Sequence, residues 1–159
     1  MAEFVVFRLE ATNIGLRAST IERVVHAVEV TPLPRAPDIA LGVINVRGTM
    51  VPVVNLRKRL GLSDRELALS DLFVIARTTE RSLAIVADSV DGVFEYAESA
   101  ITDPSTLLPG IEQIAGIANR KDGIIFIHDL DLFLSLNEAA SLDSAIATQG
   151  SEPGGNSAS

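Results

Sequence analysis

The stretch GVINVRGTMVPVVNLR, residues 42–57, decides the fold. Two short runs rich in Val and Ile, residues 42–46 and 50–55, flank the tripeptide Arg47-Gly48-Thr49. Runs of this length and β-branched composition are typical of strands. Gly48 supplies the positive φ that a tight turn between strands commonly needs. The stretch therefore predicts a β-hairpin.

Two residues in this hairpin are unusual. Pro52 has no N–H group to donate to a sheet, so it predicts an edge strand or a bulge, where the sheet is locally open. Arg47 stands at the turn, where its guanidinium can project outward. There it can bind a partner, or it can hold the adjacent backbone or a carboxylate through paired hydrogen bonds. The residues leave both roles of Arg47 open.

The same pattern of short apolar runs separated by turn residues extends through most of the chain. Three prolines make residues 31–37 a stiff, extended crossing. Many short strands, spaced roughly ten residues apart, predict an all-β fold of barrel type. The further strands are predicted at residues 3–9, 14–16, 21–30, 71–77, 82–87 and 93–96, with two more around Lys121-Asp122-Gly123 within residues 114–130.

Helices are predicted only at junctions. Residues 56–62, LRKRLGL, favour one or two helical turns followed by Gly61, at a seam between two small barrels. Asp129 is placed to cap a closing helix over residues 130–136. The face of that helix expected to pack against the barrel consists of Leu132, Phe133 and Leu136.

The C-terminal segment is predicted to be weakly structured. Residues 138–148 have enough Ala and aliphatic positions for a frayed helical extension, but not enough to assert one. Residues 151–159, SEPGGNSAS, have no side chain able to bury much surface. Such a composition cannot offset the entropy of an ordered chain, so we expect a disordered tail there.

Composition limits the function classes. With 159 residues, 47% of them hydrophobic, the chain can form one compact domain or two small subdomains around a shared core. Cysteine is absent, which excludes disulfides, thiolate metal sites and thiol nucleophiles. The net charge of -8 argues against nonspecific binding to nucleic acid or anionic lipid. No apolar segment is long enough to cross a membrane, and we expect a cytoplasmic protein.

No residues form a pattern typical of catalysis or metal binding. His26 and His128 are far apart in the sequence, and neither belongs to an HExxH motif. Ser89 beside Asp88 is not in a GxSxG turn. We therefore expect no enzymatic activity, no metal and no cofactor.

The run Arg57-Lys58-Arg59 is the one dense basic segment of this acidic sequence. Exposed charges of this kind usually form a solvated helix face. A local positive spot can also steer and orient an acidic partner. Both interpretations follow from the sequence.

A longer block around the hairpin resembles a known family. Residues 32–62, PLPRAPDIALGVINVRGTMVPVVNLRKRLGL, resemble the signature of the CheW-like chemotaxis coupling proteins: a proline turn, then GV-N-RG, then -PV-DLR. Residues 82–93 and 114–134 resemble the later strands and the closing strand and helix of that family. Together the motifs extend from about residue 3 to residue 136, in the family's order.

The resemblance implies two intertwined five-stranded SH3-like barrels over residues 3–137, with short helices at the junction and the C-terminus, and a weakly structured to disordered tail over residues 138–159. It implies a non-enzymatic adaptor that couples chemoreceptors to a CheA-type histidine kinase. The partners would be the cytoplasmic hairpin tip of the receptor and the regulatory domain of the kinase. The protein would lie in the cytoplasm at receptor arrays on the inner membrane, without inserting into it.

The resemblance also assigns residues. The receptor-binding groove would contain Ile21, Val24, Val46, Arg47 and Gly48, and the kinase-binding or junction block would contain Asn55, Leu56 and Arg57. Two positions depart from the family pattern. Arg23 stands where a glutamate typically pairs with the arginine of the RG turn, and Asn55 replaces an aspartate. Glu22 is expected to point to the opposite face of its strand.

An alternative function on the same fold is a small-ligand-binding sensory domain. In that case the groove between the two barrels would hold a metabolite rather than a protein partner.

Overall fold

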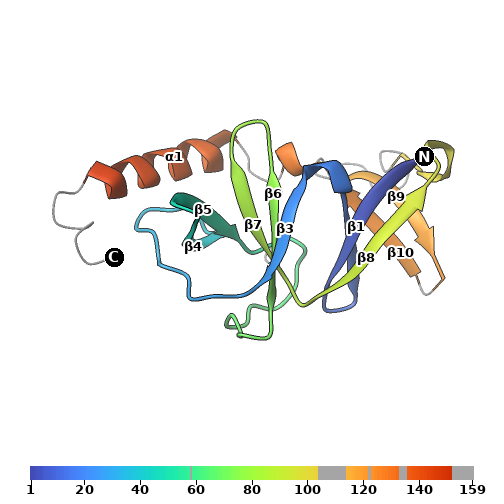
Figure 1. Ribbon diagram of the computed structural model, residues 1–159, viewed down its shortest axis with the longest axis horizontal. Helices are drawn as coiled ribbons and strands as arrows, with labels where there is room; N and C mark the ends of the chain where they lie inside the picture. The colour runs from blue at the N-terminus through green and yellow to red at the C-terminus, as the bar shows by residue number, and fades with distance from the viewer. Residues whose placement is uncertain (58, 104–113, 122, 133–135, 152–159) are drawn as a thin grey trace.

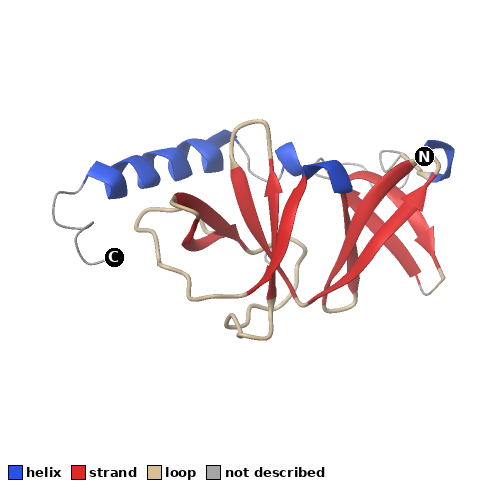
Figure 2. Cartoon of the chain, viewed as in Figure 1, coloured by secondary structure: helices blue, strands red, loops and turns tan. Residues whose placement is uncertain are grey.

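The computed structural model describes residues 1–57, 59–103, 114–121, 123–132 and 136–151. Two five-stranded sheets lie one beyond the other along the long axis, and a helix follows the second sheet (Figure 1, Figure 2). The predicted all-β architecture of two five-stranded barrels is confirmed. None of the helices in the described ranges combines the length and apolar character that a membrane crossing needs.

The first sheet has the order β8-β1-β2-β10-β9 and the second the order β3-β6-β7-β5-β4. The strands of the first sheet are β1 (Ala2–Leu9), β2 (Thr12–Arg17), β8 (Ser89–Tyr96), β9 (Ile114–Arg120) and β10 (Gly123–His128). Those of the second are β3 (Ile21–His26), β4 (Ala40–Val46), β5 (Thr49–Val54), β6 (Leu72–Arg77) and β7 (Ser82–Ala87). The helical elements are the 3-10 turns η1 (Ala18–Thr20), η2 (Glu98–Ala100) and η4 (Leu130–Leu132), and the α-helix α1 (Leu136–Ser151).

The two sheets are intertwined and follow the same plan. The chain begins in the first sheet, builds the second with β3 to β7, and returns to the first with β8. Each sheet contains one parallel pair at the corresponding place, β2 with β10 and β5 with β7. Each is also joined across its open side by one isolated bridge, Thr31 to Val43 and Thr102 to Ile117. A glycine precedes the second residue of each bridge, Gly42 and Gly116, and a Cβ there would collide with the neighbouring segment.

Four apolar layers follow one another along the long axis. The first-barrel core lies inside the first sheet, the shared core lies between the sheets, the second-barrel core lies inside the second sheet, and the helix layer lies under α1. The first-barrel core contains Phe4, Val6, Ala118, Ile125 and Ile127. The shared core contains Phe7, Leu9, Ile14, Leu16, Ile39, Val54, Leu56, Val74, Ala76, Leu83, Ile85, Ala87 and Leu130. The second-barrel core contains Ala27, Ile44, Val51, Val53, Phe73, Ile75, Ala84 and Val86, and the helix layer contains Leu33, Val43, Leu142 and Ala145.

The hairpin of residues 42–57 forms as predicted, with β4 and β5 joined by the two-residue turn Arg47-Gly48. Gly48 has φ +85°, and Arg47 also has a positive φ, +52°. Positive φ at both central residues defines a type I′ turn, whose twist matches that of the flanking strands. The sequence indicated positive φ for Gly48 only, because arginine rarely adopts this conformation.

Pro52 lies in an interior strand, so the prediction of an edge strand or a bulge is wrong. The edge strand is β4, and the bulge of this pair lies between Ala40 and Gly42. Pro52 opposes Val43, whose N–H and C=O both bond to Thr31 and not to β5. The nitrogen of Pro52 therefore faces the β7 side, where pairing begins only at Val53. The sheet is locally open beside Pro52 even though the strand is not an edge.

The C-terminal helix differs from the prediction. The segment expected to form a helix over residues 130–136 contains the short turn η4, and the long helix α1 begins only at Leu136. The predicted packing face of Leu132, Phe133 and Leu136 lies outside the described side chains. Residues 138–151, expected to be weakly structured, are helical because Leu142 and Ala145 bury against Leu33 and Val43. The predicted disorder of residues 152–159 lies outside the described residues.

Two smaller differences concern strand and turn bounds. β8 begins at Ser89, within the segment 88–92 that was expected to bend before a strand at 93–96. In the segment predicted to form one or two helical turns over residues 56–62, the described residues form turns held by the bonds from Leu60 N–H to Leu56 O (3.0 Å) and from Leu62 N–H to Arg57 O (2.8 Å). Gly61 follows with φ +74°, as expected of a glycine at such an end.

Candidate docking surfaces

An apolar seam reaches the surface where the facing sides of the two sheets meet. On β3, Ile21 opposes Ala76 and Val24 opposes Val74, and both partners belong to the shared core. Because paired residues share a face of a sheet, Ile21 and Val24 point toward the first barrel. Val24 is 40% exposed, which is unusual for a valine on the core side of a strand.

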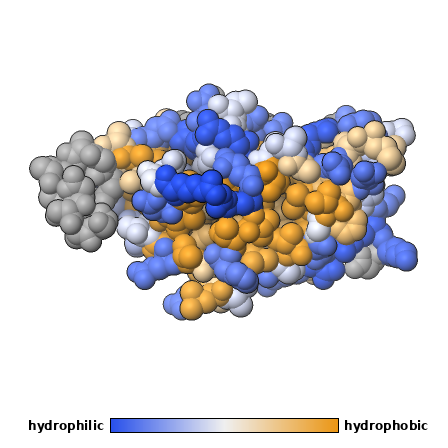
Figure 3. Space-filling view, viewed as in Figure 1, coloured by the Kyte–Doolittle hydropathy of each residue, from blue (hydrophilic) through white to orange (hydrophobic). Residues whose placement is uncertain are grey.

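The first sheet supplies the other wall of the seam. On β8, Val90 opposes Phe7 of the shared core, and Val93 opposes Val5. Val5 in turn opposes Leu16, also of the shared core, so Val93 faces the second barrel. Val93 is 58% exposed. We call Val5, Ile21, Val24, Val90 and Val93 the apolar seam, and Figure 3 shows apolar side chains across the middle of the face on which β3 and β8 lie in Figure 1.

The sequence did not identify the β8 half of this seam. Residues 88–92 contain Asp88, Asp91 and Gly92, which are typical of a bend. Strict alternation would also place Val90 and Val93, three residues apart, on opposite faces, and it is the register shift between Val6 and Phe7 that brings them onto one face. Only the pairing of β8 with β1 shows that the two valines face the same way.

The five residues expected to form the receptor-binding groove fall on two surfaces. Ile21 and Val24 belong to the apolar seam, whereas Val46, Arg47 and Gly48 form the tip of the β4–β5 hairpin. β3 and β4 are the two ends of the second sheet's strand order. Val46 packs against the second-barrel core and not the shared core. The structure therefore does not gather all five side chains along the seam.

Arg47 lies exposed at the hairpin tip, and within the described residues it has no ion-pair partner. Its turn is held instead by Asn45, whose Oδ1 accepts a hydrogen bond from Gly48 N–H (2.8 Å). Arg23, at the departure from the family pattern, is half-buried and opposes Ile75 of the second-barrel core. Its neighbour Glu22 is exposed and accepts a hydrogen bond from Ser82 Oγ (2.7 Å). Among the described residues, no carboxylate therefore takes the place of the glutamate that typically pairs with the arginine of the RG turn.

The predicted junction block is mostly internal. Leu56 is buried in the shared core, and the Asn55 Oδ1 accepts a hydrogen bond from Arg57 N–H (3.0 Å). The Arg57 side chain is 3% exposed and donates from Nη2 to both carboxylate oxygens of Asp88 (2.8 and 3.0 Å). Its Nη1 lies 3.6 Å from Glu10 Oε1.

The predicted basic spot at residues 57–59 is therefore wrong for both of its arginines. Arg57 is buried and paired, and Arg59 pairs with Glu138 of α1 (2.5 Å). Lys58 lies outside the described residues. The carboxylates that neutralise the two guanidiniums lie far along the chain, which the local run of basic residues could not reveal.

Arg57 belongs to a junction charge cluster of Glu10, Arg57, Arg65, Asp71 and Asp88. Arg65 bonds to Asp71 (2.6 and 3.0 Å) and to Asp88 (2.6 Å). Burial by itself raises the pKa values of Asp71 and Asp88, but their hydrogen bonds outweigh it and hold both pKa values below the ordinary range. For Asp88 these bonds come from Glu10 N–H, Arg65 and Arg57. The cluster ties the β1–β2 turn of the first sheet to loops of the second.

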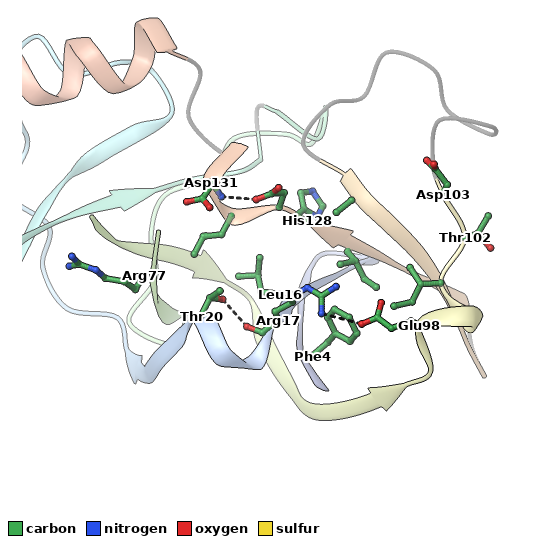
Figure 4. A pocket seen from close by; sticks show the side chains of 15 residues that line it. Phe4, Leu16, Arg17, Thr20, Arg77, Glu98, Thr102, Asp103, His128 and Asp131 are labelled. Atoms are coloured by element: carbon green, nitrogen blue, oxygen red, sulfur yellow. Dashed lines mark hydrogen bonds and ion pairs between the residues drawn. The ribbon is translucent and has the colours of Figure 1, made fainter. Parts of the chain in front are cut away.

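A cavity of about 520 Å³ is lined mainly by residues of the first sheet and the segments that adjoin it, with Arg77 of β6 as its contribution from the second sheet (Figure 4). Arg17 on its wall pairs with Glu98 (3.4 Å) and lies over the ring of Phe4 (5.4 Å to the centroid). His128 is buried, and burial lowers its pKa although its Nδ1 contact with Phe126 O (2.9 Å) opposes the shift. Its imidazole is therefore neutral at neutral pH. Nowhere in the described part of the chain do three His, Asp or Glu side chains gather as a metal site would need.

Asp129 and Asp131 line the same cavity. The Asp129 carboxylate accepts a hydrogen bond from Asp131 N–H (3.0 Å) at the start of η4, which agrees with its predicted capping role. Asp131 in turn accepts hydrogen bonds from the N–H (2.9 Å) and hydroxyl (3.3 Å) of Thr79 in the β6–β7 turn. The Asp131 carboxylate therefore joins the segment after β10 to the β6–β7 turn of the second sheet, whereas Asp129 holds the start of η4.

Comparison with known proteins agrees with this architecture. The model of the CheW-like domain family matches residues 3–138. The chemotaxis protein CheW of Thermotoga maritima is 32% identical over 129 residues, covering 81% of this chain and 85% of the relative. The chemotaxis protein CheW of Treponema pallidum is 26% identical over 146 residues, covering 88% and 86%. The crystal structure of the scaffolding protein TtCheW from Thermoanaerobacter tengcongensis superposes with a TM-score of 0.78 at 28% identity, covering 86% of this chain and 94% of that one. The chain therefore belongs to the CheW-like domain family.

Proposed function

We propose that this chain is a non-enzymatic adaptor that couples chemoreceptors to a CheA-type histidine kinase. The relatives named above are chemotaxis proteins, and the similar solved structure is a scaffolding protein. The observation that carries the proposal is the apolar seam. In it Val24 of β3 and Val93 of β8 are exposed, although each lies on the side of its edge strand that faces the other barrel. Exposed contiguous apolar surface of this kind marks a protein interaction site.

The seam suits the cytoplasmic hairpin tip of a receptor. A helix presents aliphatic side chains at spacings of three and four residues as a ridge, which fits a groove with apolar walls. β3 and β8 supply two such walls, and valine side chains lose little rotamer freedom on binding because they are stiff at χ1. Arg47 at the hairpin tip then contributes a separate polar contact to the receptor. In this proposal the chain works in the cytoplasm, at receptor arrays on the inner membrane.

The kinase's regulatory domain is the second proposed partner. Leu56 and Arg57 are buried and hold the junction between the barrels, so their role in that contact is to keep the surface above them in place. Asn55 is only half-buried and is the member of the block that can touch a partner directly.

The test is a titration of the purified chain with a receptor tip fragment and, separately, with a kinase regulatory domain. We expect both to bind, and we expect Val24→Ser and Val93→Ser each to weaken receptor binding by about tenfold. Ile124→Ser is the matched control, because Ile124 is 41% exposed but lies on β10, away from β8 in the strand order. Its effect should stay within about twofold, as for surface positions outside an interface. A folded wild-type chain that retains neither partner would refute the proposal.

The cavity beside the first sheet favours one alternative, a sensory domain that binds a small molecule. Its volume of about 520 Å³ lies within the size range of ligand pockets, and its lining mixes apolar and polar side chains. A metabolite that raises the melting temperature of the chain, together with failure to bind either protein partner, would favour this alternative.

A further inference from the structure

The loop of residues 63–70, between the turns after β5 and the start of β6, presents an exposed leucine. Leu69 is 81% exposed, the highest fraction among the large hydrophobic side chains of the described residues apart from the terminal Met1. Figure 1 places this loop at the lower edge of the second sheet, and Figure 3 shows apolar surface at that edge. A leucine held in water costs hydrophobic free energy that a partner's apolar surface would recover.

Hydrogen bonds hold this loop in place. Asp71 Oδ2 accepts a bond from Ala68 N–H (2.8 Å), and Asp71 N–H donates to Ala68 O (3.0 Å). Arg65 clamps the other side of the loop to Asp71 and Asp88 of the junction charge cluster. Leu67 packs against the second-barrel core. Leu69 is therefore displayed by a pre-ordered loop, which lowers the entropy lost when a partner binds.

The surroundings of the loop define the chemistry of the partner. A surface depression of about 450 Å³ is lined by Leu41, Arg65, Asn55 and three acidic residues, Asp38, Asp64 and Glu66. Leu41 is 38% exposed. Within the described residues none of the three carboxylates has an ion-pair partner, whereas Arg65 is already neutralised by Asp71 and Asp88. A complementary surface must combine apolar side chains with lysine or arginine.

We propose that this loop docks the kinase's regulatory domain, with Leu69 inserting into an apolar pocket whose rim carries Lys or Arg side chains. The inference rests on the proposed function and adds to it the place and the chemistry of the kinase contact. Asn55, the half-buried member of the junction block, lines the same depression and joins the loop to that block. The kinase contact then lies on a surface distinct from the apolar seam.

The experiment measures the affinity of the full chain for an isolated kinase regulatory domain and for a receptor tip fragment by calorimetry. We expect Leu69→Ser to weaken kinase-domain binding by about tenfold or more and to leave receptor binding within about twofold. Val93→Ser, in the apolar seam, is the matched control and should show the reverse pattern. Because Leu69 is 81% exposed, its substitution should leave the melting temperature unchanged, so a loss of binding reports the contact and not unfolding.

A second variant tests the charge complementarity. Asp64→Asn combined with Glu66→Gln removes two of the three unpaired carboxylates. We expect weaker kinase-domain binding at low salt and a flatter dependence of affinity on ionic strength, because fewer charge pairs remain to be screened.

The outcomes separate this inference from the proposed function. Wild-type affinity of the Leu69→Ser chain for the kinase domain would overturn the inference and leave the adaptor function standing. Loss of kinase binding in Val93→Ser alone would move the kinase contact to the seam and would also overturn it. A wild-type chain that binds neither partner would overturn both.

Discussion

Arg47 combines an exposed guanidinium with a left-handed backbone conformation, φ +52°. That conformation costs a non-glycine residue roughly 1 kcal/mol, and asparagine tolerates it better than arginine does. We predict that Arg47→Asn raises the free energy of unfolding by about 0.5–1 kcal/mol in urea denaturation, because Asn-Gly is the favoured pair for a type I′ turn. The same variant should weaken receptor binding, since it removes the guanidinium.

The control for Arg47→Asn is Arg77→Asn. Arg77 is also exposed and has no ion-pair partner among the described residues, but its φ is not positive. We expect no gain in stability there. A marked loss of stability in Arg47→Asn would show instead that the arginine side chain supports the fold.

Gly42 is required because of a close approach between segments. A Cβ at this position would collide with the carbonyl oxygen of Thr31, the residue that bridges to Val43. We predict that Gly42→Ala lowers the free energy of unfolding by about 3 kcal/mol or more, measured by chemical denaturation. Gly61→Ala is the comparison, because Gly61 has φ +74° but no atom near its added Cβ. Its cost should be limited to backbone strain, about 1 kcal/mol, and equal costs at the two sites would contradict this explanation.

Asp88 links stability to pH through the junction charge cluster. The pKa values of Asp71 and Asp88 are lowered in the folded state, so the unfolded chain binds more protons in acid. The stabilisation is fully present above the unfolded pKa of about 3.8 and is lost as pH falls through the lower folded values. We predict that the contribution of Asp71 and Asp88 to the free energy of unfolding is constant above about pH 5. Below about pH 4 this contribution should fall steeply.

Asp88→Asn separates this cause from general acid effects. At neutral pH the variant should lose about 3 kcal/mol, because the more distant Glu10 is then the one carboxylate left to pair with the buried Arg57 among the described residues. Its acid slope should be shallower than that of the wild type, since one of the two shifted carboxyl groups is gone. An unchanged slope would mean that other groups cause the acid sensitivity.

At the scale of elements, α1 is the part of the fold that depends most on distant contacts. Its docked face is small, with Leu142 and Ala145 buried against Leu33 and Val43. Arg59 pairs with Glu138 near its start, and Arg81 pairs with Asp143 in its middle (2.6 Å). Glu138 in the first turn also interacts favourably with the helix dipole. A helix of 16 residues is marginal in isolation, so this docking is what keeps it folded.

Leu142→Ala tests the docking of α1. Leu142 is fully buried, and we predict a loss of about 2–3 kcal/mol in the free energy of unfolding together with weaker helical circular dichroism. Ser144→Ala, at an exposed position of the same helix, should change stability by no more than about 0.5 kcal/mol. A Leu142→Ala variant as stable as the control would show that the helix is not docked in solution.

At the scale of the whole molecule, the two barrels form one cooperative unit. The shared core draws buried residues from both sheets, and strands of the first sheet come from both ends of the chain. If one barrel unfolded, the residues that the other barrel contributes to the shared core would become exposed to water. We predict a single unfolding transition in urea, with the same midpoint by tyrosine fluorescence and by far-ultraviolet circular dichroism.

The chain contains one tyrosine and no tryptophan, which makes this test specific. Tyr96 packs against the first-barrel core, with its ring centroid 6.4 Å from that of Phe4, so its fluorescence reports the first barrel. Circular dichroism reports the strands of both barrels. Separate midpoints by the two probes would show that the barrels unfold independently.

Most strands and the turn between β4 and β5 were predictable because their signals are local. Alternation, β-branched composition and a glycine in the right place act within a few residues. The same local signals failed where distant contacts decide the outcome. Pro52 suggested an edge, but β5 lies between β4 and β7 and tolerates the proline because its pairing with β7 begins only at Val53. The helix over residues 138–151 escaped prediction because its stability comes from Leu33 and Val43, about a hundred residues earlier.

The sequence by itself determined the fold class, the absence of cysteine chemistry and the family, since each depends on composition or on motifs short enough to be recognised along the chain. Only the tertiary structure decided which side chains are free to bind. Arg57 and Asp88 are 31 residues apart, and their pairing turns an apparent surface charge into a buried one. Val24 and Val93 lie on the facing sides of two different sheets because of how β3 pairs with β6 and β8 pairs with β1. Exposure and charge compensation are properties of contacts between distant residues, and such contacts exist only once the chain has folded.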